Sequence, residues 1–326
     1  MRISIFKSKS EYWFAAASLA KQASEAAAIA CAPWRGKNDK ISADQAAVTA
    51  ISNVLNGSNF SIFVAIGEGE LDDAPMLSVG DTLGRKESSE RLDMAVDPLE
   101  GTTLCSKNLP GAVTAIAFSS PNSLLSAPDS YMQKIMAGPR CPKELVDVDR
   151  PIRGIIIDYA DATGKPLSGI NICVLDKPRH ISLVSEIKSL GANVVLIPDV
   201  DVPAAIWVCD PDRYGIDFYM GTGGGPEGVL SAAALKCLGG QMSARFKPQD
   251  SIQYSRLLNH NPLLIDKKFT LDELVSGDVV FCMSSITGSK NMQPINITSK
   301  IAVVETMMLS SFFETVEQST SRIKLM

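Results

Sequence analysis

The chain has 326 residues, with 31 lysines and arginines against 36 aspartates and glutamates, which gives a net charge of −5. Hydrophobic residues make up 45% and charged residues 21%, values that are ordinary for globular proteins. The acidic balance, with a pI near 5.2, excludes a broad basic surface for nucleic acid or anionic membranes. The length predicts two domains or one large α/β unit.

The cysteine and histidine counts exclude several kinds of site. The seven cysteines are odd in number and form no C-x-x-C motif, which is typical of reduced thiols in a cytoplasmic protein. His180 and His260 are the two histidines, so a zinc site of the usual His/Cys type is not expected. No apolar run is long enough to predict a membrane-spanning helix.

The first half of the chain alternates helical and strand patterns. Apolar residues at helical spacing predict an amphipathic helix that ends at Cys31. A turn-rich stretch that contains Tyr131 is expected over 121–142. The other expected elements are a helix over 42–55 and strands over 60–66, 92–96 and 112–118.

The second half alternates more regularly and predicts α/β layers. A glycine loop is expected to join the last strand to the last helix. Strands are expected over 155–159, 170–175, 194–197, 205–208 and 215–220, and helices over 180–190 and 229–238. No linker divides the chain, so two interlocked α/β halves are expected, residues 1–150 and 151–326. Their approximate boundary is placed from the proline-containing stretch 142–151.

Three hydrophobic segments end abruptly in acidic residues and glycine. They are residues 66–73, 93–102 and 224–228. The C-terminal ends of strands are where open α/β sheets place ligands. Glu68, Asp97, Glu100 and Glu227 would repel one another strongly at one point unless cations were bound. Ligation by oxygen alone favours Mg²⁺ or Mn²⁺ over Zn²⁺, so the sequence predicts such a site.

The glycine-rich segment 221–228 has a second interpretation. It precedes a helix, and the amides at a helix N-terminus favour an anion such as phosphate. It also matches G-x-G-x-x-G through Gly223, Gly225 and Gly228, with Asp250 about twenty residues later. A dinucleotide site is therefore an alternative, although Glu227 would face a pyrophosphate unfavourably.

Five motifs together resemble the class II fructose-1,6-bisphosphatases of the GlpX type, which belong to the lithium-sensitive, metal-dependent sugar phosphatases. They occur in family order, and the resemblance covers nearly the whole chain. The motifs are Gly67 to Leu77, Asp97-Pro98-Leu99-Glu100-Gly101-Thr102, Ala127 to Met132, Lys177-Pro178-Arg179-His180 and Gly223 to Gly228.

The resemblance implies a layered αβαβα sandwich and hydrolysis of the 1-phosphate of fructose 1,6-bisphosphate, a step of gluconeogenesis. It implies Mn²⁺ or Mg²⁺ as cofactor, a metal-binding N-terminal half, a sugar-phosphate-binding C-terminal half, and a cytoplasmic homodimer or homotetramer. Sedoheptulose 1,7-bisphosphatase or dual activity is the nearest alternative. An NAD-linked oxidoreductase that uses the Gly223–Gly228 loop, and a regulator without turnover, are alternatives of other classes.

The resemblance also assigns site residues. It assigns metal ligation to Asp44, Glu68, Asp97, Glu100 and Glu227, and catalytic roles to Thr102, Asp72 and Lys40. Substrate contacts are implied for Glu100, Gly101, Thr102, Tyr131, Lys177, Pro178, Arg179, Asp199, Val200, Asp201 and Gly224.

The residue types leave alternatives open for several of these positions. Lys177 and Arg179 offer two cations for a phosphate, but cations on a loop are more often simply solvated. Asp199 and Asp201 follow an expected strand and suit either sugar hydroxyls or a solvated turn. For His180, packing at the start of a helix is favoured over a role in chemistry.

Overall fold

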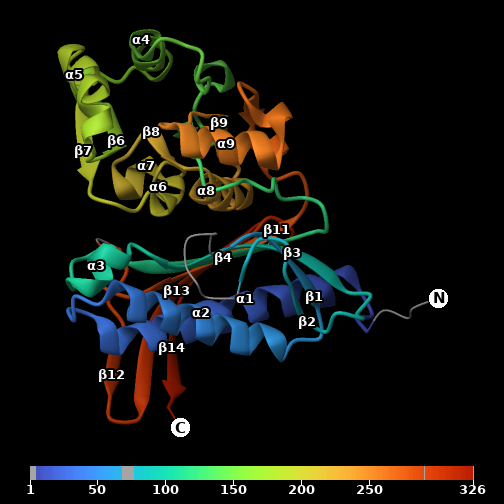
Figure 1. The fold of residues 1–326 in the computed structure, drawn as a ribbon. Helices are drawn as coiled ribbons and strands as arrows, with labels where there is room; N and C mark the ends of the chain where they lie inside the picture. The colour runs from blue at the N-terminus through green and yellow to red at the C-terminus, as the bar shows by residue number, and fades with distance from the viewer. Residues whose placement is uncertain (1–4, 68–76, 290, 326) are drawn as a thin grey trace. The chain divides into compact units, whose positions relative to one another are not determined.

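The computed structural model describes residues 5–67, 77–289 and 291–325. The chain forms two compact units, one from Met1–Ser126 together with Gly277–Met326 and the other from Ala127–Ser276. Each has its own β-sheet and its own helices (Figure 1). The first unit is discontinuous in sequence, whereas the expected halves 1–150 and 151–326 are each continuous.

The first unit is built on a sheet in the order β12-β13-β11-β4-β3-β1-β2, with β14 along β13. Strand β1 pairs with β3 in parallel, and the other described pairs are antiparallel. The helices are α1 (Lys9–Cys31), α2 (Lys40–Asn56) and α3 (Thr102–Ser106). The strands are β1 (Ser61–Ile66), β2 (Thr82–Gly84), β3 (Arg91–Glu100), β4 (Val113–Ser119), β11 (Val279–Ser285), β12 (Asn296–Thr298), β13 (Ile301–Ser310) and β14 (Thr315–Lys324).

Helix α1 covers this sheet and contacts β4, β11 and β13, while α2 packs against α1. Both helices begin at a side-chain cap. The Ser8 hydroxyl accepts a hydrogen bond from the Glu11 N–H at 3.2 Å, and the Asp39 carboxylate accepts one from the Ser42 N–H at 2.9 Å. Such caps satisfy amide groups that the first turn of a helix leaves without partners.

The second unit is built on a sheet in the order β10-β9-β5-β8-β6-β7. Strand β6 runs parallel to β7 and β8, and the other described pairs are antiparallel. The strands are β5 (Tyr131–Ala137), β6 (Asn171–Leu175), β7 (Asn193–Ile197), β8 (Phe218–Gly224), β9 (Gln241–Phe246) and β10 (Lys268–Thr270). The helices are α4 (Ile152–Thr163), α5 (Ile181–Ser189), α6 (Val202–Trp207), α7 (Pro211–Tyr214), α8 (Gly225–Leu238), α9 (Ser251–His260) and α10 (Leu271–Leu274).

Two expected strands are helical. The expected strand over 155–159 lies within α4, and the one over 205–208 overlaps α6. In α4 the buried residues Ile155, Ile156 and Tyr159 recur at helical spacing, and Gly164 ends the helix with φ of +69°. Tertiary packing of this apolar face outweighs the strand preference of three consecutive isoleucines.

Two further expectations are wrong, one for the stretch around Tyr131 and one for the glycine-rich segment 221–228. The stretch around Tyr131 is strand β5 rather than a run of turns. Strand β8 continues through Gly224, and α8 begins at Gly225, so no loop separates them. Segment 221–228 is therefore a direct strand-to-helix transition.

The expected α/β class is confirmed, because each unit combines a sheet with packed helices. The five-layer αβαβα arrangement stays a prediction. Among the described residues, none of the helices combines the length and apolar composition that crossing a membrane requires.

Candidate active site

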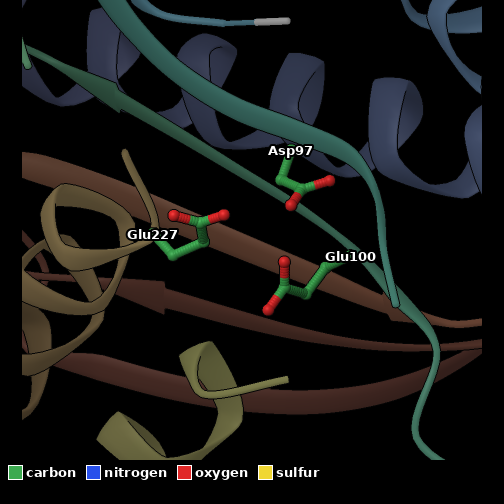
Figure 2. A group of neighbouring side chains, drawn as sticks. All are labelled: Asp97, Glu100 and Glu227. Atoms are coloured by element: carbon green, nitrogen blue, oxygen red, sulfur yellow. The ribbon is translucent and has the colours of Figure 1, made fainter. Parts of the chain in front are cut away.

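A bulge in β3 brings two acidic side chains onto the same face of the strand. Asp97 lies opposite Ala115 on β4, and Glu100 lies opposite Val113, so three steps along β3 match two along β4. In a regular strand, residues three apart point to opposite faces. The extra residue of the bulge cancels this alternation. The Asp97 and Glu100 carboxylates accordingly lie within 4.8 Å of each other (Figure 2).

The local sequence explains the bulge. Pro98 has no N–H to contribute to a strand ladder, and prolines within sheets are confined to edges, strand starts and bulges. The next N–H, that of Leu99, donates to the Asp97 Oδ1 at 3.1 Å. The expected end of this strand at residue 96 is therefore too early, because β3 continues through the bulge to Glu100.

Burial disfavours negative charge on the Asp97–Glu100 pair. Burial raises the pKa of Asp97, and hydrogen bonds from the Glu100 side chain and the Leu99 N–H lower it in part. Two carboxyl groups share a hydrogen bond only when one of them keeps a proton. A bound cation would replace that proton and allow both groups to ionise.

Asp44, on α2, belongs to the same neighbourhood of the first unit. Burial raises the pKa of the Cys31 thiol, and the nearby Cys105, Asp44 and Asp97 raise it further. Asp44 and Asp97 are thus both close enough to act on one buried thiol. Lys40 begins α2 one turn before Asp44, on the same side of the helix, and is exposed.

Thr102 begins α3 directly after the bulged strand. Gly101 makes the turn with φ of +87°, in the left-handed region that favours glycine. The Thr102 side chain is half-buried, two residues after Glu100. Glu68 and Asp72 lie outside the described residues, and their assignments stay predictions.

In the second unit, the glycines of β8 make room for neighbouring side chains. Glu227 lies in the first turn of α8. A β-carbon added to Gly224 would overlap the Glu227 Oε2, so the carboxylate occupies space that only glycine leaves open. A β-carbon on Gly221 would lie 3.2 Å from the His180 Nε2.

The structure pairs several residues to which substrate contacts were assigned. Lys177 Nζ and Asp199 Oδ1 are 2.8 Å apart. The Arg179 guanidinium lies 4.7 Å from the centre of the Tyr131 ring, and its Nε donates to the Thr222 carbonyl at 2.8 Å. This places one cation over an aromatic face beside the end of β8.

Three other assigned positions offer little side-chain chemistry. Val200 is buried, so a ligand would meet its backbone rather than its side chain. Pro178 is exposed in a short 3₁₀ helix, Pro178–His180. Gly224 lies opposite Tyr131 in the pairing of β8 with β5.

Asp201 lies in a buried network that the sequence analysis missed. Its Oδ2 lies 2.6 Å from the Lys134 Nζ and accepts a hydrogen bond from the Tyr219 hydroxyl at 2.7 Å. Burial raises the pKa of Tyr219 well above its usual value, and Asp201 raises it further, so the phenol remains a donor. A signal was present, because Lys134 is the one charged residue of β5.

His180 is a buried structural histidine. Its Nδ1 pairs with the Leu175 carbonyl and its Nε2 accepts the Thr222 N–H, both at 2.8 Å. These partners require a neutral ring with the proton on Nδ1. Burial lowers the pKa of His180, consistent with that state. The packing interpretation is confirmed.

The contacts of Asp250 remove the basis of the dinucleotide alternative. Its carboxylate accepts the Gln253 N–H at 2.8 Å and caps α9. Gly223 lies within β8, where a β-carbon would approach the Asp201 Oδ2 to 2.7 Å. Neither residue belongs to a phosphate-binding loop.

Comparison with known proteins gives a consistent family. The family model described as "Bacterial fructose-1,6-bisphosphatase, glpX-encoded" matches residues 16–322. A "Fructose-1,6-bisphosphatase class 2" of Haemophilus influenzae is 35% identical over 310 residues, covering 91% of this chain and 92% of that protein. "Fructose-1,6-bisphosphatase 1 class 2" of Escherichia coli K12 is also 35% identical over 310 residues, with 91% of each chain covered.

Among solved structures, an inositol monophosphatase from Anabaena (Nostoc) sp. PCC 7120 is similar at a TM-score of 0.40 and 15% identity. That match covers 71% of this chain and 84% of the other.

Proposed function

This chain belongs to the family of bacterial, glpX-encoded fructose-1,6-bisphosphatases, and we propose that it hydrolyses the 1-phosphate of fructose 1,6-bisphosphate to fructose 6-phosphate and inorganic phosphate. The observation that carries the chemistry is the pair of carboxylates on the β3 bulge, Asp97 and Glu100. A phosphatase of this kind needs positive charge at the transferred phosphoryl group, and a chain with net charge −5 has no excess of basic residues to supply it.

We propose that Asp44, Glu68, Asp97, Glu100 and Glu227 hold Mn²⁺ or Mg²⁺. The described members of this set offer oxygen ligands alone, which suits these ions. The Asp97–Glu100 pair and the space left by Gly224 for the Glu227 carboxylate support the fit. When bound, such an ion neutralises phosphate oxygens and lowers the pKa of a coordinated water.

We propose that residues of the second unit bind the sugar bisphosphate. Lys177 and Arg179 provide cations for phosphate, with Arg179 held over the Tyr131 ring. Lys177 is paired with Asp199, which limits the positions of its ammonium group before a ligand arrives. Pro178, Val200, Asp201 and Gly224 complete the proposed contacts.

We assign the reacting groups to the first unit. Thr102 follows Glu100 and Gly101 in the sequence, and we propose that all three residues contact the substrate. The Thr102 hydroxyl orients or deprotonates the attacking water. Asp72 or Glu68 accepts the proton, and Lys40 stabilises charge at the phosphate.

Phosphate release from a panel of substrates tests this function. The panel contains fructose 1,6-bisphosphate, sedoheptulose 1,7-bisphosphate and inositol 1-phosphate, each with Mn²⁺, Mg²⁺ or EDTA. We expect turnover of fructose 1,6-bisphosphate that EDTA abolishes and that Asp97→Ala reduces by at least about 10²-fold. The matched control is Asp212→Ala, which removes an acid that is 80% exposed and paired with Arg140.

Activity that survives EDTA, or no turnover of any bisphosphate, would contradict the proposal. The ratio of kcat/KM for the fructose and sedoheptulose substrates measures the preference between them. We propose that the protein is cytoplasmic and forms a homodimer or homotetramer, and light scattering during gel filtration measures its mass.

A further inference from the structure

A buried chain of polar contacts in the second unit ends at the backbone that carries Glu227. The Tyr219 hydroxyl donates to the Asp201 Oδ2 at 2.7 Å, and the Lys134 Nζ contacts the same oxygen at 2.6 Å. The Lys134 Nζ also donates to the Gly224 carbonyl at 3.1 Å. Four residues from β5, the start of α6 and β8 are thus linked in series.

The network is almost completely removed from solvent. The Lys134 side chain is 0% exposed and that of Asp201 is 4% exposed. Burying two charges carries a large desolvation cost, so a buried ion pair is weak evidence for added stability. A gain in stability is therefore a weak explanation for this buried pair. A better explanation is that the pair holds another group in place.

The glycine sequence of β8 accommodates this pair. A β-carbon on Gly223 would lie 2.7 Å from the Asp201 Oδ2 and 3.2 Å from the Lys134 Nζ. The ammonium group therefore lies directly against the strand and reaches its last carbonyl, that of Gly224.

Gly224 also determines where the Glu227 carboxylate lies. It is the N-cap residue of α8, and the Glu227 carboxylate folds back over it. The next N–H, that of Gly225, donates to the Ser130 carbonyl at 2.8 Å. The Gly224 C=O and the Gly225 N–H belong to one peptide group, so Lys134 and Ser130 hold the peptide at the start of α8 from both sides.

We propose that Lys134 is a positioning residue for Glu227, held in turn by Asp201 and Tyr219. It fixes the Gly224 peptide, which fixes the start of α8 and the carboxylate that reaches back over it. This inference rests on the proposed function, in which Glu227 is a metal ligand. It gives the Asp201 carboxylate a role through Lys134, beside the substrate contact proposed for this residue.

The chain contains a matched control for this network. Lys165 Nζ and the Tyr159 hydroxyl both contact the Asp217 Oδ1, at 2.6 and 2.9 Å. Asp217 is buried directly before Phe218, at the opposite end of β8 from Gly224. The same three residue types therefore also meet at the other end of β8, away from Gly224 and the start of α8.

The test measures Mn²⁺ dissociation constants by electron paramagnetic resonance, without substrate, on the full-length protein. The variants are Lys134→Met, the double variant Lys134→Met with Asp201→Asn, Tyr219→Phe and the control Lys165→Met. Groups that orient metal ligands typically contribute 10- to 100-fold in affinity, so we expect Lys134→Met to weaken Mn²⁺ binding by about 10-fold or more. We expect kcat to fall with little change in KM, and Lys165→Met to keep the wild-type Mn²⁺ affinity.

The double variant separates positioning from the cost of an unpaired buried charge. We expect it to regain the thermal midpoint that Lys134→Met loses, but not the Mn²⁺ affinity, because the Gly224 carbonyl still lacks its donor. Recovery of both would overturn the inference. If Lys134→Met does not fold, the double variant and Tyr219→Phe decide by the same measurement.

Measurements on the wild-type protein distinguish failure of the positioning role from failure of the proposed function. If the wild type turns over fructose 1,6-bisphosphate with Mn²⁺ and the Lys134 variants keep its Mn²⁺ affinity, the positioning role fails alone. If the wild type neither binds Mn²⁺ nor turns over a bisphosphate, the proposed function fails and the inference fails with it.

Discussion

The carboxylate of Glu227 and the backbone of Gly224 occupy adjoining space at the start of α8. A methyl group at Gly224 would overlap the Glu227 Oε2. The obstructing atom is the end of a flexible side chain, so Gly224→Ala would displace the carboxylate rather than prevent folding. The position of Glu227 therefore depends on the absence of a β-carbon three residues earlier.

We predict that Gly224→Ala weakens Mn²⁺ binding by about 10-fold, because Glu227 must leave its present position. Isothermal titration measures the dissociation constant. Gly154→Ala is the control, since a β-carbon there would lie 3.8 Å from the nearest atom, within α4. Equal Mn²⁺ affinity in wild type and Gly224→Ala would show that Glu227 is not a ligand.

His180 provides a pH-dependent contribution to stability. Burial lowers the pKa of His180 in the folded protein, so protons bind more tightly to the unfolded chain. Its contribution is therefore complete above the unfolded pKa of about 6.5 and is lost as the pH falls below it, towards the folded pKa. Burial also raises the pKa of Asp93 and Asp97, whose contributions are lost as the pH rises.

We predict that the wild type loses more unfolding free energy than His180→Gln between about pH 7.5 and 5.5. Glutamine supplies both a donor and an acceptor but does not titrate. Urea unfolding at each pH measures the loss, and the aspartate contributions cancel in the difference between the two proteins. Parallel pH dependence in both proteins would contradict a lowered pKa of His180.

The turn between β3 and α3 joins the bulged strand to Thr102. It depends on Gly101, whose φ of +87° costs about 1–2 kcal/mol for a residue with a side chain. Gly215 has φ of +71° at the end of α7, with open space around it. The two glycines therefore share the same backbone strain, but only Gly101 lies next to a proposed catalytic residue.

We predict that Gly101→Ala and Gly215→Ala each lower the unfolding free energy by about 1–2 kcal/mol. We expect only Gly101→Ala to lower kcat, because a change in this turn moves Thr102 relative to Asp97 and Glu100. Urea unfolding and phosphate release are measured on both variants. Equal kcat values in the two variants would remove the turn from the active site.

Elements whose sequence pattern matches their burial were predictable. Strands β1 and β4 were found from runs of apolar residues, and the acidic residues that follow β1 in the sequence and those within β3 led to the prediction of a metal site. The bulge itself was not predicted, because it depends on which residues of β3 pair with which residues of β4. Lys134 was missed because its partners Asp201 and Tyr219 lie 67 and 85 residues away. The strand nature of 221–224 was missed because glycine is ordinarily a poor strand former.

The whole chain shows the same limit of sequence patterns. The sheet of the first unit is completed by the pairing of β11 with β4, two strands more than 150 residues apart in the sequence. No local sequence pattern predicts that pairing. A boundary placed by composition therefore differs from the division by contacts, which separates residues 127–276. The carboxylates proposed as metal ligands were easier to recognise, since all but Asp44 occur in a short motif.

If several carboxylates are metal ligands, metal binding accounts for part of the net charge of −5 of the whole molecule. Without metal, burial raises the pKa of Asp97, which shows the cost of charge at this position. A cation that binds the folded chain and not the unfolded one adds about 2.7 kcal/mol of stability at 100 times its dissociation constant. We therefore predict that Mn²⁺ raises the thermal midpoint by about 4 °C.

Differential scanning fluorimetry with Mn²⁺ or EDTA measures this shift. Asp97→Asn tests the ligands of the first unit and Glu227→Gln those of the second, and each should reduce the shift. Asp212→Asn, at an exposed acid of the second unit, should keep it in full. A shift that persists unchanged in Asp97→Asn and Glu227→Gln would mean that Mn²⁺ stabilises the protein elsewhere. A shift lost in only one variant would restrict the ligand set to that unit.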